Sequence, residues 1–296
     1  MSYNPTNMYD IDQHIAEIYD HSETYCDDVD LLLNLIDTGN FDVLGRSTSQ
    51  NIKIFNIYIL EPFCGTGRIL IPLAQAGHTL VGLDQAACML DRARQKLAYL
   101  PKEVQSRVTL RQADVITDEW PSGFDLVILG GNCLYELATP EEQESVIRSA
   151  AVSLKPGGYI YLDNDHMEGD LALSWQVPGV RGCFPTGICA DGALVESTIE
   201  TIWFDTLARL AKFRRTARVL LPKVDSPNHP REAAGKIIER EYVQQKHPVS
   251  FGEVQTWLER SGFVLDQTFG DRVGNPYTPA HNRAIFWAQK PAGEIK

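Results

Sequence analysis

Apolar residues follow two different spacings through the middle of the chain. Short β-branched or aromatic runs predict strands at 54–60, 79–83, 108–110, 124–129 and 159–163. Between them, segments with helical spacing or helix-start signals predict helices at 69–75, 89–97 and 140–154. Strands that alternate with helices are typical of βαβ units, so the fold class predicted here is α/β with a parallel sheet.

This alternation of strands and helices is absent from both ends of the chain and is interrupted once between them. Residues 1–50 predict an N-terminal helical segment, and 51–168 carry the βαβ core. From 169 to 250 glycines and prolines break the pattern, and strand-like runs predict an inserted cap that contacts the substrate. Ser250 and Glu253 form a capping-box pattern that begins a helix. That helix and two closing strands make up 251–296.

Charge and composition argue against some classes of binding partner. The 296 residues are 44% hydrophobic, enough for a large core, and carry a net charge of −12. An acidic chain argues against nucleic acid and against an anionic membrane surface as partners. Six cysteines lack metal-site spacing, so no metal is expected. The sequence shows neither a secretory signal nor a membrane span, and we expect a cytoplasmic protein.

Residues that could bind a cofactor lie where the first predicted strands end. Gly65 and Gly67 follow the first strand in a turn of the kind that approaches a cofactor. Leu70 stands where a dinucleotide fingerprint places its third glycine, which disfavours NAD. Acidic residues end or follow three strands: Glu61, Asp84 and Asp114. Because the carboxyl ends of parallel strands share one edge, these acids are expected to surround one ligand.

Five ordered motifs carry a resemblance to a known family. They are Ile59-Leu-Glu-Pro-Phe-Cys-Gly-Thr-Gly67, Val81-Gly-Leu-Asp-Gln85, Gln112-Ala-Asp-Val115, Phe124-Asp-Leu-Val-Ile128 and Leu154-Lys-Pro-Gly-Gly158. In this order the chain resembles the class I S-adenosylmethionine-dependent methyltransferases, although Phe63 stands where that family usually has a small residue. The resemblance implies a Rossmann-like, mostly parallel seven-stranded sheet flanked by helices, with S-adenosyl-L-methionine as cofactor and S-adenosyl-L-homocysteine as product.

The resemblance also implies roles for individual residues. Glu61 would accept from the cofactor's ammonium, directly or through water, and Asp84 would bind both ribose hydroxyls. Asp114 would accept from the adenine amine, with the Val115 backbone on the ring. Further cofactor contacts are expected from Gly65, Gly67, Gln85, Met89, Asn132 and Tyr19. Tyr19, together with Tyr9, belongs to an N-terminal segment of the kind that closes over the cofactor in this family.

Weaker sequence signals suggest which molecule accepts the methyl group. The stretch from Gly131 to Leu137 and that from Asp163 to His166 partly resemble glycine and sarcosine N-methyltransferases. Tyr135 and His166 are therefore candidate catalytic residues, and a small-molecule amine is the expected acceptor. Candidate clamps for an anionic group on that acceptor are Arg68 and a basic cluster, Arg209 to Arg218, that includes Arg215.

Three alternatives stay open from the sequence. One is O-methylation of a small molecule with His166 as base, since a hydroxyl needs a stronger base than a neutral amine. The second is a module that binds S-adenosylmethionine without turnover, which the cofactor motifs alone do not exclude. The third, an RNA methyltransferase, is disfavoured by the charge of −12.

Overall fold

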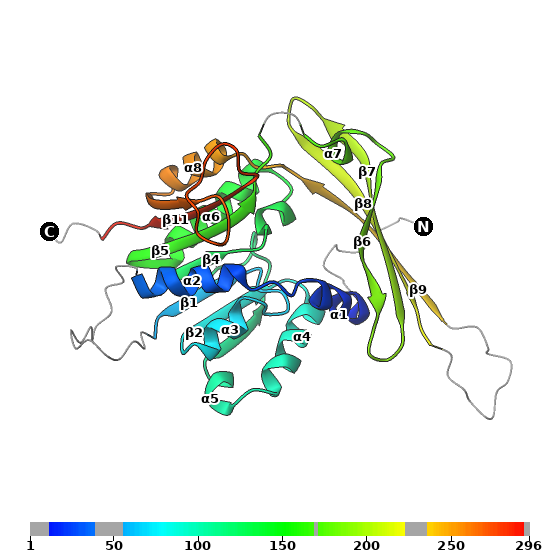
Figure 1. Ribbon diagram of the computed structural model, residues 1–296, viewed down its shortest axis with the longest axis horizontal. Coiled ribbons are helices and arrows are strands. Elements are labelled where there is room, and N and C mark those ends of the chain that lie inside the picture. The colour runs from blue at the N-terminus through cyan, green and yellow to red at the C-terminus, as the bar shows by residue number, and fades with distance from the viewer. Residues whose placement is uncertain (1–11, 39–55, 169–170, 223–235, 293–296) are drawn as a thin grey trace. The chain divides into compact units, whose positions relative to one another are not determined.

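The computed structural model describes residues 12–38, 56–168, 171–222 and 236–292. The chain divides into two compact units. The cofactor unit, as it is called below, comprises Tyr25–Gly169 and Pro248–Lys296. The sheet unit comprises Met1–Thr24 and Asp170–His247. Each has a β-sheet of its own (Figure 1). In the part of the chain that the structure describes, no helix is long and apolar enough to cross a membrane.

The sheet of the cofactor unit has seven strands in the order β10-β11-β5-β4-β1-β2-β3. The bounds are β1 Tyr58–Pro62, β2 Thr79–Asp84, β3 Val108–Gln112, β4 Phe124–Leu129, β5 Leu154–Asp165, β10 Val264–Phe269 and β11 Arg283–Gln289. Strands β3, β2, β1, β4 and β5 are parallel, whereas β11 runs antiparallel to both β5 and β10. This is the mostly parallel seven-stranded α/β fold predicted from the sequence.

Helices cover both faces of this sheet and bury two separate apolar clusters. One face packs against α2 (Asp27–Thr38), α3 (Leu70–Gln75), α4 (Ala87–Ala98) and α5 (Lys102–Gln105). The other packs against α6 (Pro140–Ser153) and α8 (Phe251–Arg260). Along β4, Leu126 and Ile128 join the first cluster while Val127 and Leu129 join the second, because successive strand residues point to opposite faces. The central strands β1, β2 and β4 are largely buried, which fixes the positions of their carboxyl ends.

Local signals fix several element ends as predicted, with one exception. Ser250 and Glu253 make both hydrogen bonds of the capping box at the start of α8. The strand expected at 159–163 begins earlier, since β5 starts at Leu154, but its pairing with β4 shifts register between Phe124 and Leu126, and Gly157 has a left-handed φ of 82°. The Gly157 amide donates to the Lys290 carbonyl oxygen at 2.8 Å, so the antiparallel neighbour extends the ladder past the proline.

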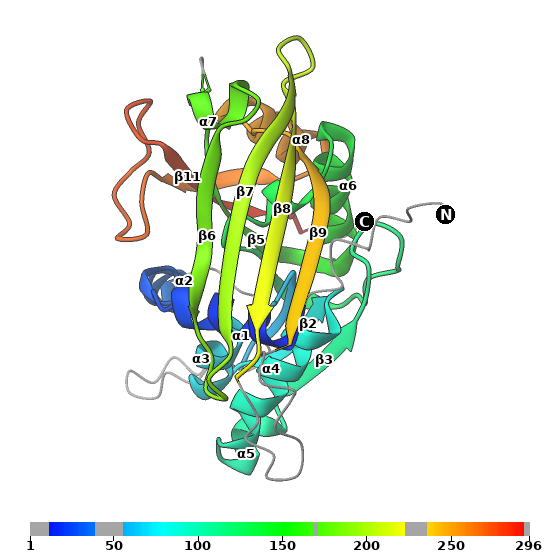
Figure 2. The ribbon, with the colours of Figure 1, turned by 90° about the vertical axis from the view of Figure 1, so that its right-hand side faces the viewer.

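The sheet unit contains four antiparallel strands in the order β6-β7-β8-β9 (Figure 2). They are β6 Arg181–Ile188, β7 Leu194–Asp205, β8 Leu210–Leu220 and β9 Ile237–Lys246. Among its described residues, two helices belong to it, α1 (Gln13–Ser22) and α7 (Leu173–Gln176). Ile18 of α1 packs with Cys189, Val195 and Val219, so the helix forms a small core with one part of this sheet.

The two faces of this second sheet differ in chemistry. Odd-numbered residues of β8 are buried or half-buried, and they include Phe213 and Ala217. Even-numbered residues point to the other face, where Arg214 lies 3.5 Å from Glu200 and Arg218 lies 3.0 Å from Glu239. Alternation along the strands therefore gives one charged, solvent-exposed face and one largely covered face.

Candidate cofactor-binding and active site

The turn after β1 has a backbone conformation that suits close approach by a ligand. Gly65 and Gly67 have φ of 53° and 78°, in the left-handed region that favours glycine. A Cβ atom at Gly65 would meet nothing within 4 Å, so the turn borders open space. Phe63 is also left-handed, with φ of 66°, which costs a non-glycine residue about 1–2 kcal/mol. Strained backbone of this kind is concentrated at functional sites.

Asp84 joins the end of β2 to this turn. Its Oδ2 accepts from the Gly65 amide at 2.8 Å, and its Oδ1 accepts from the Ala86 amide at 2.8 Å. Burial raises the pKa of this carboxyl group, and the two amides oppose that rise by favouring the charged form. Each carboxylate oxygen has a second lone pair, so these contacts leave acceptor capacity for a ligand's hydroxyls.

Asp114, after β3, is positioned by Gln85, after β2. The Gln85 side-chain amide donates to Asp114 Oδ2 at 3.0 Å, and the Ile116 amide donates to Oδ1 at 2.9 Å. The Val115 carbonyl oxygen accepts from Trp120 Nε1 at 3.0 Å, which holds the backbone that follows Asp114. The structure thus brings three of the predicted cofactor residues, Gln85, Asp114 and Val115, to the carboxyl ends of adjacent strands.

Glu61 lies at the end of β1 and is 4% exposed. Burial raises its pKa to about 8, against the opposing charge of Arg68. Its Oε2 has no hydrogen-bond partner among the residues that the structure describes. A buried carboxylate oxygen without a donor is costly, and a cationic ligand group would relieve that cost.

Asn132 and Tyr135, after β4, are both bonded to Asp165 at the end of β5. The Asn132 side-chain amide donates to Asp165 Oδ2 at 2.8 Å, and Asn132 Oδ1 accepts from the Asp165 amide at 2.6 Å. The Tyr135 hydroxyl donates to the Asp165 carbonyl oxygen at 2.7 Å. These contacts tie the ends of two neighbouring strands together and fix the backbone that leads into His166.

His166 directly follows β5 and is 5% exposed. It packs against Phe286 and Phe251, with ring centroids 5.8 Å and 6.2 Å away. Neither ring nitrogen has a hydrogen-bond partner of normal geometry in the described segments. Burial lowers the pKa of this imidazole to about 4, so it is neutral at pH 7 and only weakly basic.

A buried ion-pair network at the same end of the sheet was not found by sequence reasoning. Asp28, which is fully buried, accepts from two nitrogens of Arg68 at 2.7 Å and 2.6 Å. Asp163 accepts from Arg272 Nε at 2.8 Å and also from Arg283. The Tyr25 ring connects the two halves of this network.

The Tyr25 ring makes a cation–π contact with each of two guanidinium groups. The Arg68 carbon lies 3.9 Å from the ring centroid and the Arg272 carbon 4.2 Å from it. A Cβ atom at Gly131 would lie 3.5 Å from Arg68 Nη2 and 3.9 Å from the Tyr25 hydroxyl. The network therefore reaches the end of β4. In the sequence, the signal for this network was the charged side chain of Asp163 in a predicted strand that is otherwise apolar.

The remaining residues predicted to bind cofactor or substrate are divided between the two units. Arg68 belongs to the cofactor unit, where its guanidinium is committed to Asp28. Met89, on α4, is 8% exposed. Tyr19 and Arg215 belong to the sheet unit, where Arg215 donates to the Tyr242 hydroxyl at 3.4 Å. Their proposed contacts with cofactor or substrate stay predictions, and Tyr9 lies outside the described residues.

The residues at these strand ends fit S-adenosylmethionine. The partnerless Glu61 oxygen suits an ammonium group, the open turn at Gly65 suits close approach, and Asp84 retains lone pairs for ribose hydroxyls. No group of three or more His, Cys, Asp or Glu side chains is arranged to hold a metal ion in the segments that the structure describes.

Comparison with known proteins agrees with this geometry. Residues 60–160 match a family model described as a methyltransferase domain. A cypemycin N-terminal methyltransferase from Streptomyces sp is 29% identical over 146 residues, 49% of this chain and 56% of that protein. A ubiquinone biosynthesis O-methyltransferase from Stutzerimonas stutzeri (strain A1501) is 30% identical over 112 residues, 38% of this chain and 46% of that protein. The chain thus spans about half the length of these relatives.

A solved structure extends the likeness of fold to both units. It is the SAM-bound amino pentose methyltransferase from Micromonospora echinaspora involved in calicheamicin biosynthesis. It aligns with a TM-score of 0.59 and 18% identity, over 97% of this chain and 100% of that one. Residues 60–160 of this chain therefore match a methyltransferase domain, and the strand order and the solved structure show the fold of the S-adenosylmethionine-dependent methyltransferases.

Proposed function

We propose that this protein transfers the methyl group of S-adenosylmethionine to a nitrogen atom of a small-molecule amine. The observation that carries the proposal is the arrangement of Glu61, Gly65 and Asp84 at the ends of β1 and β2. A buried acid, an open glycine turn and a second acid bonded to that turn provide the acceptors that an amino acid joined to a nucleoside requires.

The chain's own residues would bind and orient the cofactor. Glu61 would accept from its ammonium group, Asp84 from its ribose hydroxyls, and Asp114 from its adenine amine. When bound, S-adenosylmethionine supplies a methyl carbon on a sulfonium, and a carbon–nitrogen bond forms as the carbon–sulfur bond breaks. Fixing two reactants in line can account for much of the rate enhancement of such a displacement.

The environment of His166 favours an amine over a hydroxyl as acceptor. A general base works best when its pKa lies near the working pH, and burial lowers the pKa of His166 to about 4. An amine that binds in its neutral form needs no base before attack and releases its proton afterwards. A hydroxyl must lose its proton during attack, which a weakly basic imidazole does poorly. The Tyr135 hydroxyl donates to the Asp165 backbone and serves here to position the strand end.

Charge supports a small acceptor. The net charge of −12 opposes polyanionic substrates such as RNA at long range. The named relatives include one N-terminal methyltransferase and one O-methyltransferase, so their names support methyl transfer without selecting the acceptor atom.

Transfer of label from methyl-labelled S-adenosylmethionine tests the proposal. The acceptors are matched amines, phenols and carboxylates of similar size. We expect label on amine nitrogen, at a rate that rises with pH as the acceptor's free-base fraction grows. His166→Gln is expected to lower that rate by less than about 100-fold, the lower limit for loss of a general base. Label confined to phenols, carboxylates or RNA would contradict the proposal, and cofactor binding without label on any acceptor would favour a non-catalytic module.

A further inference from the structure

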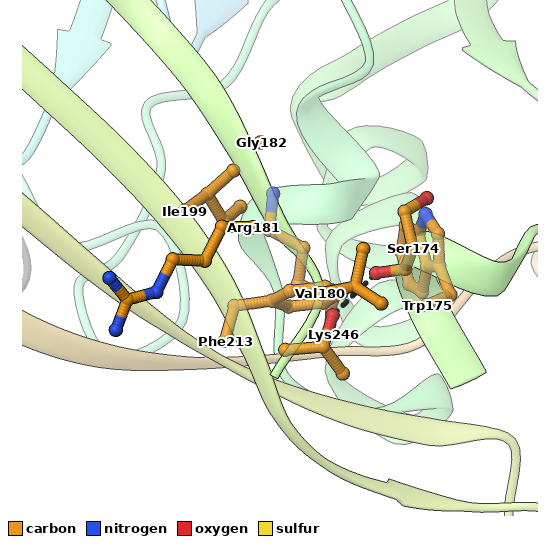
Figure 3. Close-up of a pocket in the computed structure, with 9 residues that line it drawn as sticks. Ser174, Trp175, Val180, Arg181, Gly182, Ile199, Phe213 and Lys246 are labelled. Carbon is orange, nitrogen blue, oxygen red and sulfur yellow. Dashed lines mark hydrogen bonds between the residues drawn. The ribbon is translucent and has the colours of Figure 1, made fainter. Parts of the chain in front are cut away.

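The sheet unit contains a pocket of its own, with a volume of about 300 Å³. All four strands of its sheet and α7 contribute to the lining (Figure 3). The lining residues are Ser174, Trp175, Val180, Arg181, Gly182, Ile199, Thr201, Phe213 and Lys246. This volume is at the lower end of the range for small-molecule sites, so the pocket suits a ligand of about one ring.

Hydrogen bonds around Thr201 fix one side of the pocket. The Thr201 hydroxyl donates to the Ser174 carbonyl oxygen, which ties α7 to β7. The Thr201 carbonyl oxygen accepts from the Gly179 amide at 2.8 Å, and the Thr201 amide donates to Val180 at 3.2 Å. Three contacts from one buried residue fix the segment between α7 and β6, so the pocket is preformed.

Aromatic and aliphatic side chains form one wall. The Trp175 ring meets Phe213 edge-to-face, with centroids 5.0 Å apart and planes at 84°. Phe213 is 4% exposed, whereas Trp175 is half-buried and accessible. Ile199 on β7 completes this apolar lining. Such a wall favours a flat or aliphatic ring, since aromatic pairs gain from edge-to-face and offset contact.

Two basic residues line the pocket, and one of them is buried. Lys246, at the end of β9, is 8% exposed, although lysine side chains are seldom so well buried. Arg181 also lines the pocket, but its guanidinium extends away from the aromatic rings (Figure 3). None of the lining residues in this described part of the chain is acidic. The pocket therefore combines an apolar wall with a positive charge.

We propose that this pocket is a binding site for a small organic anion, namely a single ring that carries a carboxylate. The ring would contact Trp175 and Phe213, and the carboxylate would accept from the Lys246 ammonium.

Calorimetric titration of the full-length protein with phenylacetate and with uncharged phenylacetamide tests this site. We expect phenylacetate to bind at least about 10-fold more tightly, the smaller effect expected for one charge-assisted hydrogen bond. Lys246→Met keeps an unbranched apolar stem and should remove the preference, while Lys246→Arg should retain it. Lys212→Met is the matched control, because Lys212 lies on the charged face of the same sheet beside Trp203.

Each outcome is decisive because binding is measured without turnover. No phenylacetate binding, equal binding of both probes, or an unchanged preference in a folded Lys246→Met protein would overturn the site. A preference lost in Lys246→Met and kept in Lys212→Met supports it. Two sources share this chemistry, the methyl acceptor and a separate metabolite. If phenylacetate inhibits methyl transfer in competition with the acceptor, the pocket is the acceptor's site. If the inhibition is noncompetitive, the pocket is the site of a separate effector.

Discussion

Glu61→Gln removes a buried carboxyl group whose pKa burial raises to about 8, from an ordinary value of 4.5. Between these two values the folded protein holds a proton that the unfolded chain has released. The folded state then binds more protons, so its stability falls as pH rises through this window. Glutamine has nearly the same shape but does not titrate, so the variant should lose this part of the pH dependence.

The size of the effect follows from the shift in pKa. At 1.36 kcal/mol per pKa unit, the free energy of unfolding of the parent should fall by about 3 kcal/mol relative to the variant from about pH 5 to about pH 8. Glu61 is 4% exposed, so solvent screening reduces this little. Any constant cost of burying the glutamine amide cancels, because the comparison is between pH values.

Urea unfolding at several pH values, followed by tryptophan fluorescence, measures this difference. Glu119→Gln is the control, because it removes the charge of an exposed carboxyl group from the same unit. Parallel stability curves for the parent and Glu61→Gln would refute the reasoning. Binding should show the reverse sign, since an ammonium ligand favours ionised Glu61. The parent's affinity for S-adenosylhomocysteine should rise by a factor of tens from about pH 6 to about pH 8, and that of Glu61→Gln should not.

Three further predictions concern the same unit. Asp84→Ala should weaken cofactor binding by about 1.5–3 kcal/mol in calorimetry, and unchanged affinity in a folded variant would count against the ribose contact. Asp163→Asn removes the negative charge beside two arginines and should lower the free energy of unfolding in urea by about 3–5 kcal/mol. The control Asp266→Asn changes an exposed side chain and should lower it little, so equal effects would contradict the ion-pair network. Gly82→Ala should cost about 1–3 kcal/mol, because its Cβ would lie 2.6 Å from Leu70, while Gly252→Ala meets no atom within 4 Å and should not destabilise.

The cofactor unit could be predicted because its signals are local. The run at 124–129 coincides with β4, and the capping-box pattern at Ser250 and Glu253 begins α8. Motif order was enough to predict that Gln85 and Asp114 lie at neighbouring strand ends. Periodicity and capping depend on residues within about one turn of each other, which a sequence displays directly.

Long-range pairings could not be predicted in this way. Asp163 and Arg272 are far apart in the chain, and their contact depends on how β10 and β11 close the sheet. Strand β6 and helix α7 were missed because glycine and proline interrupt any period there. Residues 1–50 read as one helical segment, yet α1 belongs to the sheet unit and α2 to the cofactor unit. Equal helical spacing carries no information about which sheet a helix covers.

A crystal structure with S-adenosylhomocysteine bound tests the central claim most directly. The account predicts the ribose hydroxyls within hydrogen-bond distance of the Asp84 carboxylate at the end of β2, and the amino group at Glu61 Oε2. It also predicts adenine beside Asp114 and Val115. A ligand bound elsewhere, or bound at these strand ends with its amino group away from Glu61, would contradict the account.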